Sequence, residues 1–299
     1  CCQMIQRAGS LGVRIKAMEP LVHNKFEVLD NYDWTRNTKE NYQADGREQS
    51  GPYASIRSRI LFDVHGCYIA RRQEMQDKFI DEVIGAGEGS DHPWAVFSAG
   101  AFFSGKSFVI PWMQKQGYLA LPNLVRTDPD YFRMRLPEWK RYLEANPHTA
   151  GEMTHVEAGT CSLIAQWESM RQGRHVFIDG SLQHYPRQSE FFGEIRAAHP
   201  QYRIAIINVH CDWDILLKRS AIPREGGRVI SEEVLKRCFD NVNESVAKLE
   251  ALANLVVHVE NNSETPQLAR VVMDGVPKPG TWQDVRSCLG EPAAACLIL

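Results

Sequence analysis

Hydrophobic positions follow two periods along this chain, and segments of the two kinds alternate. Short apolar runs predict buried strands, at residues 94–97, 124–125, 175–178, 202–209 and 255–259. Apolar residues spaced three or four apart predict helices, at residues 71–84, 154–171, 212–220 and 231–249. Because strands alternate with helices, we expect an α/β fold in which helices cover both faces of a parallel sheet.

The two ends of the chain differ from this alternating region. Residues 30–52 are polar and rich in turn-forming residues, which predicts a long loop ahead of the helix at 71–84. A length of 299 residues and a hydrophobic content of 43% suit one main core with an appended segment. We therefore expect an N-terminal helical extension over residues 1–90, one α/β domain over residues 91–275 and a tail over residues 276–299.

A glycine-rich motif follows the first predicted strand. Residues 100–107 are G-A-F-F-S-G-K-S, which fits the phosphate-loop pattern G-x-x-x-x-G-K-[S/T]. In such a loop, backbone N–H groups point at phosphate oxygens, a lysine reaches the β- and γ-phosphates, and a hydroxyl binds Mg²⁺. Lys106 and Ser107 have the residue types for the last two roles. The motif therefore predicts an ATP and Mg²⁺ site, formed by Gly100, Ala101, Phe102, Phe103, Ser104, Gly105, Lys106 and Ser107.

A glycine turn without a ligand is the alternative interpretation of this motif. Phe102 and Phe103 are bulky for a loop that approaches a ligand closely, and Pro111 comes soon after the start of the predicted helix. The order of strand, glycine turn and helix nevertheless favours a phosphate loop, which makes the expected sheet one of the P-loop NTPase type.

Polar residues gather where the predicted strands end, and active residues of parallel sheets lie at those ends. Asp128 and Asp130 follow the second strand, and Asp179 follows the third. One of the paired aspartates can simply cap the helix that comes next. Residues 210–212 (His, Cys, Asp) follow the fourth strand, but they lack metal-ligand spacing, so we expect a strand end and a helix cap there.

Four segments, in the same order, resemble motifs of the zeta toxin family of small-molecule kinases. The phosphate loop is the first, and D-P-D-Y-F-R-M-R-L-P-E-W at 128–139 is the second. D-G-S at 179–181 is similar to the E-G-T of the family, and K-R-S-A-I-P-R-E-G-G-R-V-I-S at 218–231 is similar to its arginine-bearing lid. The resemblance covers roughly residues 90–260.

This resemblance implies an ATP-dependent kinase that phosphorylates a hydroxyl group of a small molecule, with a UDP-sugar such as UDP-N-acetylglucosamine as a candidate acceptor. It implies that Asp130 is the general base and that Arg219 and Arg228 clamp the ATP phosphates. We expect Arg224, which lies between the two arginines, to share their charge. Solvated surface positions are the alternative for Arg219 and Arg228.

On the acceptor side we expect three residues to contact the substrate: Arg133, Asp179 and Ser181. For Asp179, holding Mg²⁺ through water stays open as a second role. Glu157, on the helix before the third strand, is a further candidate to face the substrate. Gln183 and Leu136 stand where the family has an arginine and a histidine near the sugar-nucleotide pocket of its bacterial members. The resemblance therefore supports phosphotransfer more strongly than any one acceptor, and it identifies no antitoxin partner.

Two other functions stay open. A polynucleotide or nucleoside kinase shares the phosphate loop and the arginine lid. The chain has 34 Lys and Arg against 37 Asp and Glu, and this net charge of −3 provides no basic excess for nucleic acid. A nucleotide-binding regulatory module without catalysis is the other alternative, and the presence of both Lys106 and Asp130 argues against it.

Cysteine spacing and hydropathy bear on the compartment. The eight cysteines show no C-x-x-C spacing, which favours a reducing compartment over disulfides or a zinc site. No apolar run reaches the ~18 residues of a membrane span, so we expect a cytoplasmic protein. Cys296 and the three aliphatic residues after it fit the prenylation pattern C-a-a-X, without a basic patch upstream. A lipid anchor at Cys296 is thus the alternative to an unmodified tail.

Overall fold

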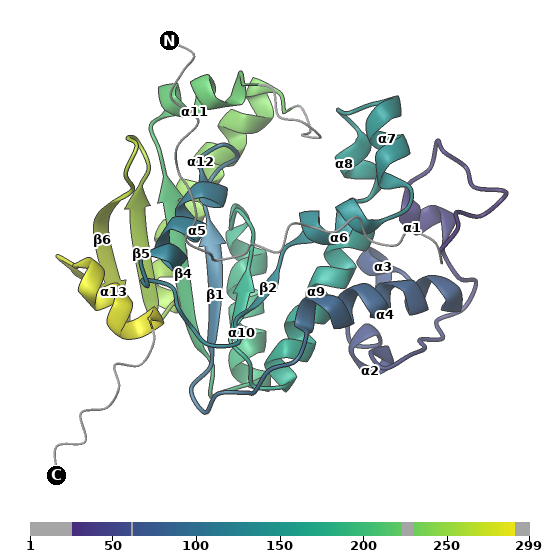
Figure 1. Ribbon diagram of the computed structural model, residues 1–299, viewed down its shortest axis with the longest axis horizontal. Helices are drawn as coiled ribbons and strands as arrows, with labels where there is room; N and C mark the ends of the chain where they lie inside the picture. Colours follow the sequence, from purple (N-terminus) through teal and green to yellow (C-terminus); the bar gives the residue numbers. More distant parts are fainter. Residues whose placement is uncertain (1–25, 61, 223–229, 291–299) are drawn as a thin grey trace, which may run out of the picture.

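A seven-stranded sheet forms the centre of the computed structural model, which describes residues 26–60, 62–222 and 230–290 (Figure 1). The strand order is β2-β3-β1-β4-β5-β6-β7. The strands are β1 (Trp94–Ala99), β2 (Val125–Thr127), β3 (Val176–Ile178), β4 (Arg203–His210), β5 (Leu255–Glu260), β6 (Gln267–Met273) and β7 (Val276–Lys278).

Helices surround this sheet and fill most of the remaining chain. They are α1 (Thr38–Asn41), α2 (Ala54–Arg57), α3 (Phe62–His65), α4 (Ala70–Ile84), α5 (Lys106–Lys115), α6 (Pro129–Arg135), α7 (Trp139–Ala145), α8 (Ala150–Met153), α9 (His155–Arg171), α10 (Tyr185–Ala198), α11 (Trp213–Ser220), α12 (Glu232–Leu249), the 3₁₀ turn η1 (Glu250–Leu252) and α13 (Trp282–Leu289).

The predicted parallel sheet is confirmed for β1 to β5. Wherever two of these five strands are neighbours they pair in parallel, as the alternation of strands and helices requires. The sheet is mixed overall, because β6 pairs antiparallel with β5 and β7 pairs antiparallel with β6. The hydrophobic pattern predicts neither of these two strands, and it does not predict the helix α13 that follows them.

Both faces of the sheet are covered, which explains why every residue of β1 is buried. Phe97 on one face packs in a core that includes Phe192 of α10 and Val246 of α12. Val96 on the other face packs in a core that includes Val109 of α5 and Val285 of α13. The carboxyl edge of the sheet is left for the loops that follow the strands.

The N-terminal extension packs on the side of the domain formed by α6, α7 and α9. In Figure 1 the helices α1 to α4, drawn in purple and blue, lie beside α9, and all four contact that helix. Ile80 and Ile84 of α4 share a core with Phe132 of α6 and Ile164 of α9. The predicted helix at 71–84 is confirmed, whereas the predicted loop at 30–52 contains α1 and several buried residues.

The predicted tail is folded as far as residue 290. It contains β7 and α13, and Val285 and Leu289 of α13 are fully buried. The boundary expected at residue 275 therefore falls inside a hairpin, where it does not separate two structural units. Cys296 lies outside the described residues, as does the prenylation pattern that it begins.

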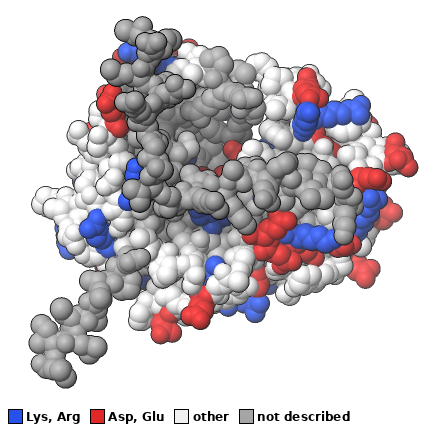
Figure 2. All heavy atoms as spheres, in the orientation of Figure 1, with Lys and Arg blue, Asp and Glu red and all other residues white. Residues whose placement is uncertain are grey.

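Two further features are the distribution of charge on the surface and the hydropathy of the helices. On the face drawn in Figure 2, basic and acidic side chains are interspersed over the described residues. Within 26–60, 62–222 and 230–290, no helix combines the length and the apolar character needed to cross a bilayer.

Candidate active site

The phosphate-loop motif forms the turn between β1 and α5, and Lys106 is the first residue of the helix. Gly100 and Gly105 both have positive φ values, of 140° and 96°. A Cβ atom on Gly100 would lie 2.4 Å from the carbonyl oxygen of Val209, and one on Gly105 would lie 2.1 Å from Nδ2 of Asn261. The two glycines are thus required both for the backbone conformation and for the close approach of neighbouring strands.

Phe102 and Phe103, whose bulk favoured the alternative of a glycine turn without a ligand, pack against the hydrophobic core. Phe102 and Phe103 are half-buried against the core that contains Phe97, so their rings point into the protein. Phe103 adopts the left-handed conformation, with a φ of 62°. Since the rings lie on the core side, they leave the backbone of the loop on the other side, where a ligand can approach it.

Lys106 folds back over the loop that precedes it. Its Nζ donates to the carbonyl oxygens of Gly100, at 2.7 Å, and Ala101, at 3.2 Å. The ammonium group is therefore held at the mouth of the loop, and Ser107 is exposed beside it. Both side chains therefore lie at the mouth of the loop, which is where the lysine and hydroxyl of a phosphate loop act in proteins that bind triphosphates.

Arg219, at the end of α11, braces the loop from the opposite side. Its Nη1 donates to the carbonyl oxygen of Ser104 at 3.1 Å, and its Nη2 donates to that of Asn261 at 2.7 Å. Asn261 also contacts the loop directly, because its Nδ2 donates to the same Ser104 carbonyl at 2.9 Å. The predicted lid arginine thus lies at the phosphate loop, together with an asparagine that the sequence analysis missed.

The two paired aspartates have different local roles. Asp128 caps α6, since its side chain accepts from the N–H of Asp130 at 2.8 Å. Asp130 instead forms an ion pair with Arg133 one turn later, and its side chain is 57% exposed. The capping interpretation therefore holds for Asp128, and the carboxylate of Asp130 is accessible to a substrate.

The pKa of Asp128 is shifted by burial and by charged groups of the neighbouring strand and the phosphate loop. Burial and the negative charge of Asp179 raise the pKa of Asp128 to about 6, while Arg126, Arg133 and Lys106 oppose the shift. Asp179, at the end of β3, accepts from the hydroxyl of Ser98 in β1 at 2.5 Å. Three neighbouring strands, β2, β3 and β1, thus bring carboxylates and the loop lysine to the same edge of the sheet.

Ser98 is a second residue that the sequence analysis missed. Besides donating to Asp179, its oxygen accepts from the N–H of Gly180 at 3.0 Å, which fixes the turn that follows β3. Ser181 lies in this turn, half-buried, and its carbonyl accepts from the N–H of Gly100 at 3.3 Å. The D-G-S motif is therefore joined to the start of the phosphate loop.

Glu157 does not lie where the sequence analysis placed it. Its side chain is fully buried and forms an ion pair with Arg72 of α4, at 2.6 Å. Because Arg72 takes up both carboxylate oxygens, Glu157 cannot also face the substrate. Arg224 and Arg228, the two other predicted lid arginines, lie outside the described residues.

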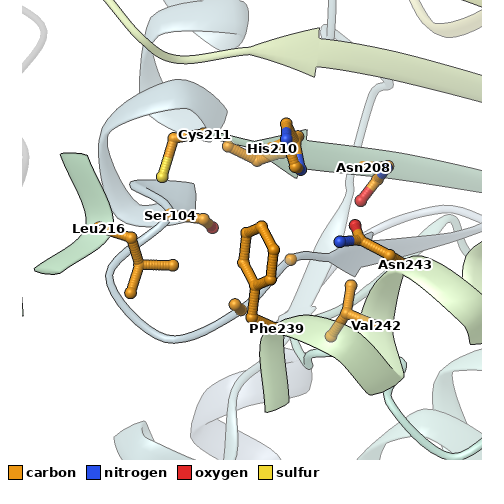
Figure 3. A pocket seen from close by; sticks show the side chains of 11 residues that line it. Ser104, Asn208, His210, Cys211, Leu216, Phe239, Val242 and Asn243 are labelled. Carbon is orange, nitrogen blue, oxygen red and sulfur yellow. The ribbon is translucent and has the colours of Figure 1, made fainter. Parts of the chain in front are cut away.

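A cavity of about 10 Å³ lies beneath the phosphate loop, on the side of β4 and α12 (Figure 3). Polar side chains of Ser104, Asn208 and Asn243 line it, with the ring of Phe239 between them. The Ser104 hydroxyl is buried there and has no hydrogen-bond partner within the described part of the chain. A space of this size fits one water molecule and is far too small for a nucleotide.

Metal ligands are sparse around this site. Among the described residues, no group of three or more His, Cys, Asp or Glu side chains is arranged to hold a metal ion. Mg²⁺ in phosphotransferases usually keeps several waters and takes its other ligands from phosphates and one or two protein oxygens. The Ser107 hydroxyl therefore suits a Mg²⁺ that arrives with the nucleotide.

The mixed sheet and the phosphate loop between β1 and α5 define a P-loop kinase-like fold. The sequence model of the family described as "Zeta toxin" matches residues 81–270, which is more than half of the chain. The chain therefore belongs to the zeta toxin family.

Solved structures with the same fold come from toxin–antitoxin and related complexes. A chain of the PezAT chromosomal toxin–antitoxin system of Streptococcus pneumoniae is 17% identical, with a TM-score of 0.51 over 63% of this chain and 76% of that chain. A chain of the AvrRxo1-ORF1–ORF2 structure with ATP is 11% identical, with a TM-score of 0.54 over 87% of this chain and 83% of that chain.

The AvrRxo1-ORF1–AvrRxo1-ORF2 structure with sulphate ions contains a chain that is 13% identical. Its TM-score is 0.55, over 84% of this chain and 82% of that chain. At such identities the likeness shows the fold alone, and it includes residues outside 81–270. A search of curated protein sequences found no match to this chain.

Proposed function

We propose that this chain is an ATP-dependent kinase that transfers the γ-phosphate of ATP to a hydroxyl group of a small molecule. The observation that carries the proposal is that Asp179 and Ser181, just after β3, are hydrogen-bonded to Ser98 of β1 and to Gly100 of the phosphate loop. The strand that leads to Asp130, β2, pairs with β3 at the same edge of the sheet. A base and a phosphate loop that meet at one edge can hold an acceptor between them. Membership of the zeta toxin family supports the same reaction class.

We assign each residue of the site a separate role in the transfer of the phosphate. The Asp130 carboxylate accepts the proton of the acceptor hydroxyl, whose oxygen attacks the γ-phosphorus. The bond from that phosphorus to the β–γ bridging oxygen breaks, and ADP leaves. Lys106 and Arg219 neutralise charge on the transferring phosphate, as loop lysines and lid arginines do in phosphoryl transfer. We assign the remaining lid charge to Arg224 and Arg228.

Three further residues orient the base or line the acceptor side in our proposal. Arg133 fixes the direction of the Asp130 carboxylate through their ion pair. Asp179, held by Ser98, and Ser181 line the acceptor side next to the phosphate loop. The Ser107 hydroxyl would hold a Mg²⁺ ion together with the phosphates, and the ion would supply further charge neutralisation.

A UDP-sugar such as UDP-N-acetylglucosamine is the first acceptor to test. Leu136 is only 2% exposed, so at this position the chain offers core packing and no polar contact for an acceptor. The acceptor must then be recognised through the exposed carboxylate of Asp130, with Asp179 and Ser181. These groups suit hydroxyl-rich molecules, because carboxylates accept hydrogen bonds from sugar hydroxyls, and the Ser181 hydroxyl can both donate to them and accept from them.

The test uses ATP labelled at the γ-phosphate, with UDP-N-acetylglucosamine in one reaction and a metabolite extract in another. The proposal predicts label in a small molecule, and none with the Lys106→Ala variant as the control. Label transferred only to an oligonucleotide would favour a polynucleotide kinase instead. Binding of ATP without transfer to any acceptor would leave the catalytically silent regulatory module as the better interpretation.

A further inference from the structure

Arg72 of α4 joins the N-terminal extension to the α/β domain through two buried ion pairs. Arg72 lies outside the residues matched by the zeta toxin family, which begin at residue 81. Its guanidinium is 3% exposed and contacts two carboxylates that are fully buried, those of Glu138 and Glu157. Both glutamates belong to the α/β domain, on segments that flank α6 in space.

Arg72 binds both glutamates in a forked arrangement. Nη1 and Nη2 donate to Glu138 at 3.0 and 2.9 Å, and Nε and Nη2 donate to Glu157 at 2.6 and 2.9 Å. The ring of Tyr42 lies 3.9 Å from the guanidinium carbon, and its hydroxyl donates to Glu138 at 2.5 Å. Such a paired fork fixes the relative orientation of its partners, because a guanidinium is planar and rigid.

The two glutamates are connected to α6 in different ways, Glu138 through the chain and Glu157 through α9. Glu138 follows the end of α6 by three residues, so Arg72 fixes the point at which that helix leaves the site. Glu157 lies in the first turn of α9, whose N-cap is Thr154. The Thr154 hydroxyl accepts from Nε of Arg133 at 3.1 Å, and Arg133 forms the ion pair with Asp130. These contacts, together with the first turn of α9 that carries Thr154 and Glu157, therefore connect the extension to the proposed base.

We propose that Arg72 is a positioning residue, which holds α6 so that Asp130 and Arg133 face the phosphate loop. The inference rests on the proposed function for the role of Asp130, and it makes the N-terminal extension a part of the catalytic unit. Arg72 touches neither nucleotide nor acceptor in this proposal. Its effect passes through Glu138, Glu157 and Thr154.

A variant that removes all three buried charges tests this role without leaving any one of them unpaired. Arg72→Met by itself would strand two buried carboxylates, so it is combined with Glu138→Gln and Glu157→Gln. The control is Arg57→Met with Asp77→Asn, which removes another buried ion pair, 2.6 Å long, whose two partners both lie in the extension. Melting temperatures of both variants show how much each pair stabilises the fold.

Hydrogen–deuterium exchange of the whole chain measures the position of α6 independently of activity. We expect roughly tenfold faster exchange of residues 129–135 in the Arg72 triple variant, with the phosphate loop unchanged. In the Arg57 control we expect exchange of residues 129–135 to match the wild type. Unchanged exchange of α6 in the triple variant would overturn the inference.

Turnover supplies the second measurement, with labelled ATP and UDP-N-acetylglucosamine. We expect kcat to fall ~10- to 10²-fold in the triple variant while the Kd for ATP stays the same, because only the acceptor side has moved. A merely structural ion pair would leave kcat of the folded protein at the wild-type value, and that result would overturn the inference. If the wild type transfers no phosphate, the proposed function fails, and exchange of α6 alone decides whether Arg72 holds that helix.

Discussion

Arg219 donates from Nη1 to the backbone carbonyl of Ser104 at 3.1 Å, which joins the end of α11 to the phosphate loop. The same guanidinium also reaches the carbonyl of Asn261, at the end of β5. An arginine that holds the loop in this way affects the site before any nucleotide binds. Its role therefore combines loop support with the charge neutralisation expected of a lid residue.

Arg219→Ala should weaken ATP binding several-fold and lower kcat by a larger factor. The loop loses one brace, which affects binding, and the transition state loses a positive charge, which affects turnover alone. Calorimetric titration with ATP and initial-rate kinetics measure the two effects. Lys218→Ala, at the exposed neighbouring position, is the matched control. Equal losses in binding and turnover would contradict a role in the transition state.

Lys106→Ala should leave the fold intact and abolish phosphotransfer. The Nζ group donates to two backbone carbonyls of the loop, and alanine is well suited to the first turn of α5, so we expect the fold to tolerate the change. Circular dichroism and labelled-ATP transfer check the two parts of this prediction. Lys115→Ala, at the far end of α5, removes an equal charge from an exposed position and should keep activity. Normal turnover by the Lys106 variant would rule out the phosphate-loop mechanism.

Asp130→Asn should lower kcat by ~10²–10⁴, the usual effect of losing a positioned general base. Affinity for ATP should hardly change, because the carboxylate acts on the acceptor. Asp128→Asn should be much milder, since asparagine also caps helices and can keep the hydrogen bond from the N–H of Asp130. Single-turnover rates with saturating ATP compare the two variants. If the Asp128 variant were inactive and the Asp130 variant active, the general base would be Asp128, and our assignment of Asp130 would be wrong.

Asp128 should also impose a pH dependence on stability. Burial and Asp179 raise the pKa of Asp128 from 3.8 to about 6, so the folded state binds this proton more tightly than the unfolded chain. Between these two pKa values the folded state holds more protons, and the free energy of unfolding falls as the pH rises. Asp128→Asn removes this contribution.

Urea unfolding of both proteins at several pH values measures the effect. The unfolding free energy of the wild type minus that of the Asp128→Asn variant should decrease through the window from 3.8 to about 6. Carboxylates whose pKa is lowered, such as Glu168 beside Arg171, produce the opposite slope in both proteins and cancel in the difference. A difference that stays constant with pH would contradict the assigned shift.

The hydrophobic pattern predicts the central elements well because they are buried on all sides. In β4, every residue between its two ends is buried, and such a run has few other interpretations. The same pattern is weak for α10, which fully buries only Phe192 and Ile195, and for β7, whose three residues are all exposed. An element with little buried surface leaves little hydrophobic signal, so the hairpin and α10 could not be predicted in this way.

The candidate site could also be predicted only in part, because some of its residues are close in sequence and others are far apart. The phosphate loop is a local motif, so its residues can be found in eight consecutive positions. Asn261 and Ser104 are 157 residues apart, and only the register of β5 beside β4 brings them together. Glu157 was misplaced for the same reason, because its partner Arg72 lies 85 residues earlier, in a different part of the chain. A polar residue at the end of β5 was nevertheless a signal for Asn261 that could have been used.

Both edges of the sheet are strands of only three residues, β2 and β7. A strand this short offers few unpaired backbone groups to an incoming chain, and short edge strands are one way in which proteins resist edge-to-edge aggregation. At one edge, β7 pairs only with residues 271–273 of β6, so an added strand would find no more than a few consecutive residues along either edge of the sheet. The same feature should keep the folded protein monodisperse at the high concentrations that crystallisation requires.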